Sequence, residues 1–241
     1  MNRRRPTYFV IVAAALALIC AVGASAQDYT AIVAAPDRSD ADRQTDQRRK
    51  PAEMLAFSGV RASMKVLDMG AGGGYSTELW ARAVGPSGAV YAQDARERDN
   101  FTARAQGLAM KNVVRLVRPF DDPVPPDVRN LDLITFFFYY HDTAYMAVDR
   151  AKMNRALFAA LKPGGVLVLA DHSARAGDGA TVTNTLHRIE EAVVRGELEA
   201  AGFRLAAEAQ FLRNPADPRD KPVFRHPIPV DEFVLKFEKP R

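Results

Sequence analysis

The stretch "LDMGAGGGYSTELW", residues Leu67–Trp80, places four glycines within five positions between an apolar run and a helix-like segment. Glycine has no Cβ, so a loop of this kind lets backbone N–H groups and a helix N-terminus come close to a bound ligand. The apolar run predicts a short strand over 64–70, and the apolar spacing after the loop predicts a helix over 75–84. The sequence therefore indicates a strand–loop–helix unit that binds a ligand.

Strand and helix patterns alternate after this unit. Further strands are expected up to Asp94 and over 112–120, 131–142, 166–171, 204–213 and 232–239, with helices over 144–165 and 185–203. This alternation predicts an α/β fold with a mainly parallel sheet, whose ligands bind beyond the carboxyl ends of the strands. We expect the polar residues that follow the strands to converge on one rim: Asp94, Asp121, His141, Asp142, Asp171 and His172.

Three kinds of glycine-rich loop are known to bind a ligand between a strand and a helix, and the sequence can be compared with each of them. A phosphate-binding P-loop needs a lysine that the stretch lacks. A dinucleotide fingerprint would put Tyr75 where its third glycine packs the helix against the strand, and tyrosine is too bulky there. The pattern present is D-x-G-x-G-x-G, formed by Asp68, Gly70, Gly72 and Gly74. It resembles the first motif of class I S-adenosylmethionine (SAM)-dependent methyltransferases.

The resemblance continues along the chain, over roughly residues 50 to 240. Residues 72–94 are similar to the corresponding stretch of the protein L-isoaspartate methyltransferases, and "LKPGGVLVLAD", residues 161–171, resembles a late motif of the family. The resemblance implies a Rossmann-like, seven-stranded, mainly parallel sheet with helices on both faces and the last strand antiparallel. It also implies that residues 51–241 form a SAM-dependent methyltransferase domain.

The resemblance assigns a cofactor site for SAM. The glycine loop would line the methionine part of the cofactor, Asp68 would fix the loop and reach the ammonium group, and Asp94 would bind the ribose hydroxyls. Asp121, with Asp122 behind it, is the candidate for the adenine contact, although "RPFDDP" departs from the usual form of that motif. The candidate cofactor residues are Asp68, Gly70, Ala71, Gly72, Gly74, Asp94 and Asp121.

Chemistry is expected after the fourth strand, where the resemblance places the methyl acceptor. His141 is either a general base or a hydrogen-bonded structural histidine, and Tyr140 either lines the acceptor pocket or packs in the core. The candidate catalytic residues are Tyr140, His141, Asp142 and His172. The signature of base and amide methylation, an Asn or Asp followed by Pro-Pro and an aromatic residue, is absent from this place.

A metal is not predicted, although one pairing is suggestive. Asp142 with Asp171 resembles the acidic ligands of metal-dependent catechol-type O-methyltransferases, but no third ligand is evident from the sequence. His187 is expected to be a surface residue paired with Glu190 and Glu191, one turn along a helix.

Three further segments each have two interpretations. The stretches 172–184 and 213–229 are either lids over a pocket or solvated surface loops. Arg48, Arg49 and Lys50 either bind a carboxylate or form a solvated run of charge.

The N-terminus has the pattern of a secretory signal. Arg3–Arg5 form a basic region, an apolar run extends from about residue 8 to 23, and Ala24–Ala26 provides an A-x-A cleavage site. We expect residues 1–26 to be a signal peptide cleaved after Ala26, which would make the protein periplasmic or secreted; the alternative is an uncleaved anchor. Residues 27–50 are expected to form a polar linker or a first helix.

Composition sets limits on partners. The leader contains Cys20, the only cysteine, so the mature chain would have neither a disulfide nor a cysteine ligand. Arg3–Arg5 supply three of the four net positive charges, so the net charge gives no reason to infer a nucleic-acid partner, and none is expected. Because the apolar run is short and a cleavage site follows it, we expect no stable membrane insertion after cleavage.

The function expected is SAM-dependent methyl transfer to an oxygen or nitrogen of a small molecule or an accessible protein group. The alternatives are a non-catalytic binding protein with the SAM fold outside the cytoplasm, and an NAD-dependent oxidoreductase.

Overall fold

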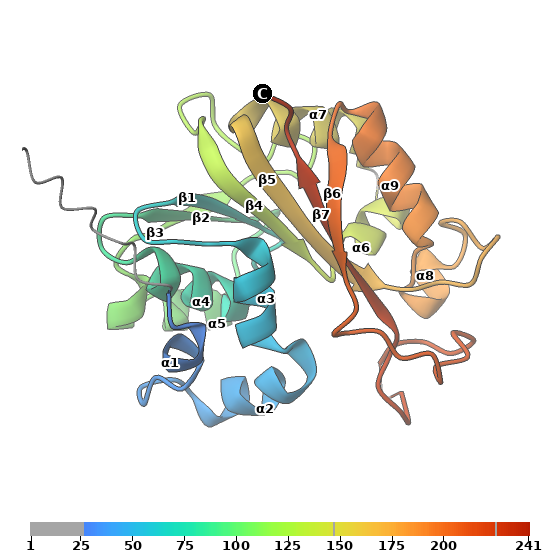
Figure 1. The fold of residues 1–241 in the computed structure, drawn as a ribbon, viewed down its shortest axis with the longest axis horizontal. Coiled ribbons are helices and arrows are strands. Elements are labelled where there is room, and N and C mark those ends of the chain that lie inside the picture. The colour runs from blue at the N-terminus through green and yellow to red at the C-terminus, as the bar shows by residue number, and fades with distance from the viewer. Residues whose placement is uncertain (1–26, 147, 225) are drawn as a thin grey trace, which may run out of the picture.

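The structure is a computed structural model that describes residues 27–146, 148–224 and 226–241, so the predicted signal peptide lies outside the described residues. Its centre is one seven-stranded sheet with the order β3-β2-β1-β4-β5-β7-β6 (Figure 1). The strands are β1 (Lys65–Met69), β2 (Ala89–Asp94), β3 (Val113–Val117), β4 (Leu131–Phe137), β5 (Leu161–His172), β6 (Arg204–Ala209) and β7 (Glu232–Glu238).

The helices are α1 (Tyr29–Val33), α2 (Asp40–Arg49), α3 (Pro51–Ser58), α4 (Tyr75–Val84), α5 (Asp99–Arg104), α6 (Tyr140–Tyr145), α7 (Arg150–Ala160), α8 (Thr183–Leu186) and α9 (Glu191–Ala200), with a 3-10 turn at Leu108–Met110. Among the described residues, no helix combines the length and the apolar character needed to cross a bilayer.

The pairing of the strands confirms the expected fold class. Strands β1 to β5 pair in parallel, whereas β7 runs antiparallel between β5 and β6. One face of the sheet packs in a core with α7 and α9, through residues such as Leu157 and Leu198. The other face packs against α3 and α4, through Leu55 and Trp80. The carboxyl ends of β1, β2, β4 and β5 therefore share one rim, as predicted.

Some element boundaries differ from those expected. The strand predicted over 131–142 ends at Phe137, because Phe138 takes a left-handed backbone conformation with φ 57° and Tyr140 starts α6. The helix predicted over 144–165 begins at Arg150, and β5 already starts at Leu161. The helix predicted over 185–203 is interrupted at His187, whose φ is 52°. The breaks at Phe138 and His187 place side chains at the rim of the sheet.

Residues 27–50 fold as α1 and α2 rather than as a linker. Two contacts fasten α2 to the helices that follow the first two strands: the Tyr75 hydroxyl of α4 donates to Asp46 at 2.6 Å, and Arg104 of α5 pairs with Asp42 at 2.6 Å. Arg38, in the turn before α2, pairs with the same Asp46 at 2.6 Å. Because Tyr75 is the first residue of α4, α2 lies next to the glycine loop.

Candidate active site

The glycine loop joins β1 to α4 with its backbone facing open space at one position. A Cβ on Gly70 would approach Tyr139 to 3.1 Å, and a Cβ on Gly73 would approach Asn100 to 2.5 Å. At Gly72, with φ 54°, the nearest atom to such a Cβ is 3.9 Å away. Side chains thus pack against the loop at Gly70 and Gly73 but leave space beside Gly72. A cofactor could therefore contact the backbone of the loop at Gly72.

Asp68 holds the loop from below. Its carboxylate accepts hydrogen bonds from Thr77 of α4 at 2.6 Å and from Thr135 of β4 at 2.9 Å. Burial raises the pKa of Asp68 to about 6, against the two threonine hydrogen bonds, which lower it. Asp68 therefore fixes the loop to two neighbouring elements, as expected, and its contact with the cofactor ammonium group stays a prediction.

Asp94 lies at the end of β2 and its carboxylate faces the loop. It accepts from the backbone N–H of Gly72 at 3.3 Å and from Nε of Arg98 at 3.1 Å. Arg98 also reaches the Tyr139 hydroxyl at 3.5 Å. A carboxylate beside the open backbone of Gly72 fits the ribose of SAM, provided that Arg98 shares or releases its contact when the hydroxyls bind.

Gln93 is a loop-positioning residue that the sequence reasoning missed. Its side-chain Oε1 accepts from Gly70 N at 3.2 Å, its backbone oxygen accepts from Ala71 N at 2.8 Å, and its Nε2 donates to the Arg118 carbonyl at 2.7 Å. The signal available was its place directly before Asp94 at the end of a strand. Gln93 therefore links the glycine loop to the end of β3 and fixes the position of the loop relative to the sheet.

Asp121 follows β3 and lies at the surface facing α7. Its carboxylate is 3.5 Å from Nζ of Lys152, and the neighbouring Asp122 forms an ion pair with Arg118. Its assignment to the adenine of SAM stays a prediction.

Tyr140 is not a pocket residue, which corrects the expectation that it could line the acceptor site. Its side chain is fully buried, its hydroxyl donates to Glu197 at 2.6 Å, and Asn154 donates to that hydroxyl at 2.8 Å. Because Tyr140 is the first residue of α6, its side chain points into the core, whereas Tyr139 packs on the glycine loop.

His141 is held between two carboxylates. Its Nδ1 lies 2.6 Å from Asp171, which also accepts from the His141 backbone N–H at 2.8 Å, and its Nε2 lies 3.0 Å from Asp142. Burial alone would lower the pKa of His141, but the charge of Asp171 and the hydrogen bond with Asp142 outweigh it and raise the pKa to about 10. The imidazole is therefore a cation at neutral pH.

His187 does not pair with Glu190 and Glu191, so that expectation is wrong. Its left-handed backbone brings Nδ1 to 3.2 Å from Asp142 Oδ1. Ligand-type atoms of His141, Asp142 and His187 all lie within 4.8 Å of one another. This set could hold a divalent metal, with Asp171 as the outer partner that orients His141. His187 supplies the third side chain that the sequence did not reveal.

His172 and Glu232 form a second buried pair on the same rim. Their Nδ1 and Oε1 atoms are 3.0 Å apart, but neither has an aligned hydrogen-bond partner within the described residues. Burial lowers the pKa of His172 to about 3 and raises the pKa of Glu232 to about 7. His172 is therefore neutral at neutral pH.

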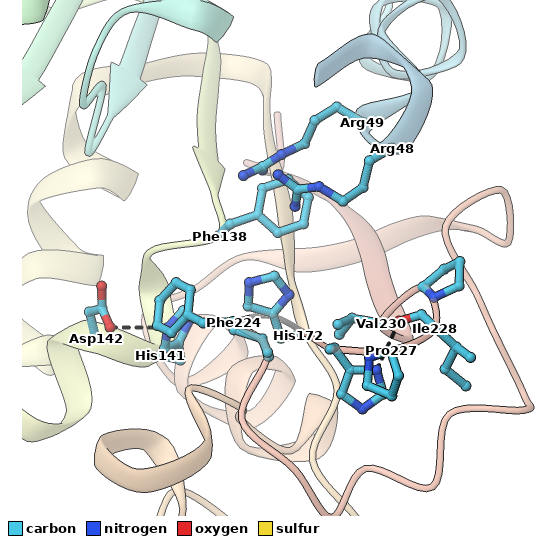
Figure 2. Close-up of a pocket in the computed structure, with 13 residues that line it drawn as sticks. Arg48, Arg49, Phe138, His141, Asp142, His172, Phe224, Pro227, Ile228 and Val230 are labelled. Carbon is cyan, nitrogen blue, oxygen red and sulfur yellow. Dashed lines mark hydrogen bonds and ion pairs between the residues drawn. The ribbon is translucent and has the colours of Figure 1, made fainter. Parts of the chain in front are cut away.

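A cavity of about 630 Å³ opens above these groups (Figure 2). Its floor comes from the ends of β4 and β5, through Phe138, His141, Asp142 and His172. The remaining walls come from the end of α2 and from the segment before β7, with lining residues Arg48, Arg49, Val223, Phe224, His226, Pro227, Ile228, Pro229 and Val230. Arg49 is therefore a cavity residue, and the run 48–50 is not simply a solvated charge cluster.

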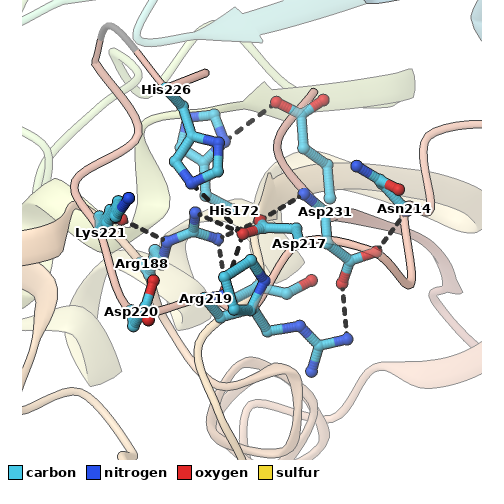
Figure 3. Close-up of polar contacts among 12 residues, drawn as sticks. His172, Arg188, Asn214, Asp217, Arg219, Asp220, Lys221, His226 and Asp231 are labelled. Carbon is cyan, nitrogen blue, oxygen red and sulfur yellow. Dashed lines mark hydrogen bonds and ion pairs between the residues drawn. The ribbon is translucent and has the colours of Figure 1, made fainter. Parts of the chain in front are cut away.

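A buried ion pair fixes the segment that walls the cavity (Figure 3). Arg188 and Asp217 are fully buried and lie 2.8 Å apart, and Arg188 also donates to the Lys221 carbonyl at 3.0 Å. Within the stretch 213–229, Asp217 and Lys221 are thus anchored to Arg188, and residues 223, 224 and 226–229 wall the cavity. The stretch 172–184 is tied at its tip, where the Glu190 carboxylate accepts from Gly177 N and Gly179 N.

A family comparison agrees with this arrangement. The model of a methyltransferase domain family matches residues 40–215. The chain therefore belongs to this methyltransferase domain family, and the predicted class, that of SAM-dependent methyltransferase enzymes with SAM as cofactor, is confirmed at the level of the family.

Curated relatives lie in the same class. The ubiquinone/menaquinone biosynthesis C-methyltransferase UbiE of Idiomarina loihiensis is 33% identical over 122 residues, which cover 48% of this chain and 45% of that protein. The UbiE protein of Pasteurella multocida is 29% identical over 160 residues, which cover 63% of this chain and 57% of the relative. The chain thus spans about half the length of the curated relatives it matches.

Solved structures show the same fold at low identity. A SAM-dependent methyltransferase from Aquifex aeolicus superposes with a TM-score of 0.62 at 21% identity, covering 89% of this chain and 100% of that chain. A Burkholderia thailandensis 1,6-didemethyltoxoflavin-N1-methyltransferase, solved with its substrate and S-adenosylhomocysteine, has a TM-score of 0.56 at 21% identity and covers 83% of this chain and 82% of its own.

Proposed function

We propose that this chain transfers a methyl group from SAM to an oxygen or nitrogen of an acceptor bound in the cavity. One observation carries the proposal: the segment after β4 touches both places. Tyr139 packs on Gly70 of the cofactor loop, while Phe138, His141 and Asp142 line the cavity. An acceptor in the cavity and a cofactor on the loop would therefore both contact residues of the same short segment, 138–142.

The roles of the residues follow from their charges. SAM supplies an electrophilic methyl group when bound, so the protein has to position the acceptor and receive its proton. His141 carries a proton at neutral pH, and Asp142 is the carboxylate that lines the cavity. We assign to Asp142 both the hydrogen bond to the acceptor and the receipt of the proton that the acceptor loses, with His141 and Asp171 positioning the Asp142 carboxylate.

An assay with labelled cofactor tests the proposal. The protein is incubated with SAM carrying a deuterated methyl group and with a metabolite extract, and products are sought by mass spectrometry. A product that carries the label in an O-methyl or N-methyl group supports the proposal. Complete absence of labelled product, in protein that binds SAM, would favour the non-catalytic alternative.

Carbon is a second candidate acceptor atom, favoured by the relatives that are named C-methyltransferases. The same experiment separates the two, because NMR of the labelled product distinguishes a methyl group on carbon from one on oxygen or nitrogen by its chemical shift.

Gly72→Val should abolish detectable SAM binding, because the valine side chain would enter the open space beside the loop. Asp94→Ala should weaken SAM binding by about 10- to 100-fold, since the ribose hydroxyls lose a charged hydrogen-bond partner. Calorimetry with SAM measures both. Gly59→Val is the matched control: Gly59 has φ 71° and open space around it but ends α3, away from the loop, so SAM affinity should be unchanged. Binding of NAD without binding of SAM would overturn the assignment.

We also propose that residues 1–26 are removed after Ala26 and that the mature chain is periplasmic or secreted. The basic Arg3–Arg5 region, the apolar run and the Ala24–Ala26 site support this. N-terminal sequencing of the native protein should start at Gln27, and Ala26→Leu should block processing. A native protein that keeps its leader in the membrane fraction would contradict the proposal.

A further inference from the structure

The end of α2 directs an arginine into the cavity (Figure 2). The helix ends at Arg49, Lys50 turns the chain with φ 48°, and Pro51 begins α3 at once. The turn places the guanidinium carbon of Arg49 only 3.6 Å from the ring centroid of Phe138. Phe138 itself has a left-handed backbone, which bulky residues rarely adopt, and this conformation sets its ring beneath the guanidinium.

No ion pair within 4.0 Å and no side-chain hydrogen bond joins Arg49 to another described residue, although the charge of Glu232 acts on it. Its Nε is buried and has no hydrogen-bond partner within the described residues. The ion pair at this end of α2 joins Arg48, not Arg49, to Glu232, at 4.0 Å. Burial, together with the charge of Arg48, lowers the pKa of Arg49 to about 10, which leaves it positive at neutral pH. The half-buried Arg49 thus lines the cavity with no carboxylate hydrogen-bonded to its guanidinium, which leaves N–H donors for an anion that arrives with the ligand.

The rest of the cavity defines the body of that ligand. Its volume of about 630 Å³ is in the range that holds small organic molecules. Apolar side chains form much of its wall, among them Phe138, Phe224 and Ile228. Arg48 and Arg49 at the end of α2 give the cavity one cationic side, and the carboxylate of Asp142 provides a hydrogen-bond acceptor on its floor.

We propose that this cavity recognises a small organic acid, whose carboxylate pairs with Arg49 and whose apolar body lies against Phe138 and Phe224. A guanidinium stacked on an aromatic ring presents its planar N–H donors edge-on, which suits a bidentate contact with a carboxylate. The identification of the acid as the methyl acceptor rests on the proposed function, whereas its binding does not. The end of the acid opposite the carboxylate would then meet Asp142.

Matched pairs of probes test the proposal. Calorimetry is carried out with benzoate, 4-hydroxycinnamate and octanoate, each compared with its uncharged carboxamide. We expect at least one acid to bind about 10- to 100-fold more tightly than its amide. Arg49→Met keeps an apolar side chain over Phe138 and removes the charge, so it should abolish the preference for that acid and leave the amide affinity unchanged.

Two controls separate recognition from folding and from catalysis. Arg204→Met removes the same charge from an exposed site on β6 and should keep the preference for the acid. Arg49→Met should melt no lower than the native protein, because it breaks no side-chain hydrogen bond or close ion pair of the described residues and keeps an apolar contact with Phe138. The proposal is overturned if no acid binds, if acid and amide bind equally, or if Arg49→Met keeps the preference or melts at a lower temperature. Binding of SAM, measured separately, reports on the proposed function alone.

Discussion

His141→Gln is expected to lower the rate of methyl transfer by about 10²-fold while leaving SAM affinity unchanged, the loss that follows when a reacting group is displaced by about an ångström. The cofactor candidates lie on the loop after β1 and at the end of β2, whereas His141 bonds to Asp142 and Asp171 at the ends of β4 and β5. The change would be measured as kcat with the acceptor identified by the labelled-methyl assay, alongside calorimetry with SAM. Full activity in His141→Gln would remove His141 from the mechanism.

The pH profile distinguishes a positioning cation from a general base. The pKa of His141 is raised from 6.5 to about 10, so its contribution to stability is complete below about pH 6.5 and is lost as the pH rises towards 10. If the cation positions Asp142, kcat falls as the pH approaches 10, and Asp171→Asn moves that fall to lower pH. An activity that instead rises as His141 loses its proton would make it the base. Loss of activity with a chelator, restored by a divalent ion, would make His141, Asp142 and His187 metal ligands.

Asp217→Asn is expected to lower the free energy of unfolding by about 3–5 kcal/mol, the usual cost of leaving one member of a buried ion pair uncompensated. The Arg188 guanidinium would stay buried beneath the cavity wall with its carboxylate partner removed. Burial by itself would raise the pKa of Asp217, but the backbone N–H groups of Asp231 and Arg219 and the charge of Arg188 hold it below its ordinary value. The destabilisation should therefore shrink only as the pH falls below about 4.

Asp220→Asn is the matched control for this measurement. Asp220 lies in the same segment and pairs with Arg175 at 3.5 Å, but both side chains are exposed. Its loss should change the free energy of unfolding by less than about 1 kcal/mol. Chemical denaturation measures the free energy of unfolding of both variants. Equal losses in the two would show that burial does not set the energetic cost of breaking these ion pairs.

Local pattern was enough to predict an α/β fold with a ligand-binding glycine loop, whereas the seven strands, the antiparallel last strand and SAM as cofactor were predicted from the family resemblance. The spacing of Asp68, Gly70, Gly72 and Gly74, with an acidic strand end at Asp94, is set within about 30 consecutive residues of a strand–loop–helix–strand unit. Each of these features depends on the backbone conformation of its own segment, so the order of the residues along the chain carries it. The β4 and β5 ends were predicted to meet for the same reason.

The cavity proposed to hold the acceptor was decided only by the tertiary structure, because it is assembled from segments far apart in the chain. No local pattern brings Arg49 of α2 over Phe138, or His187 beside Asp142; both contacts depend on left-handed turns at Lys50, Phe138 and His187 and on packing across the sheet. Packing likewise turned Tyr140 into the core, since the strand before it ends sooner than its apolar run suggests. The order of residues along the chain predicts where a cofactor would meet the backbone, whereas long-range packing decides which charges face the cavity, because the surroundings of a charge are defined by its neighbours in space.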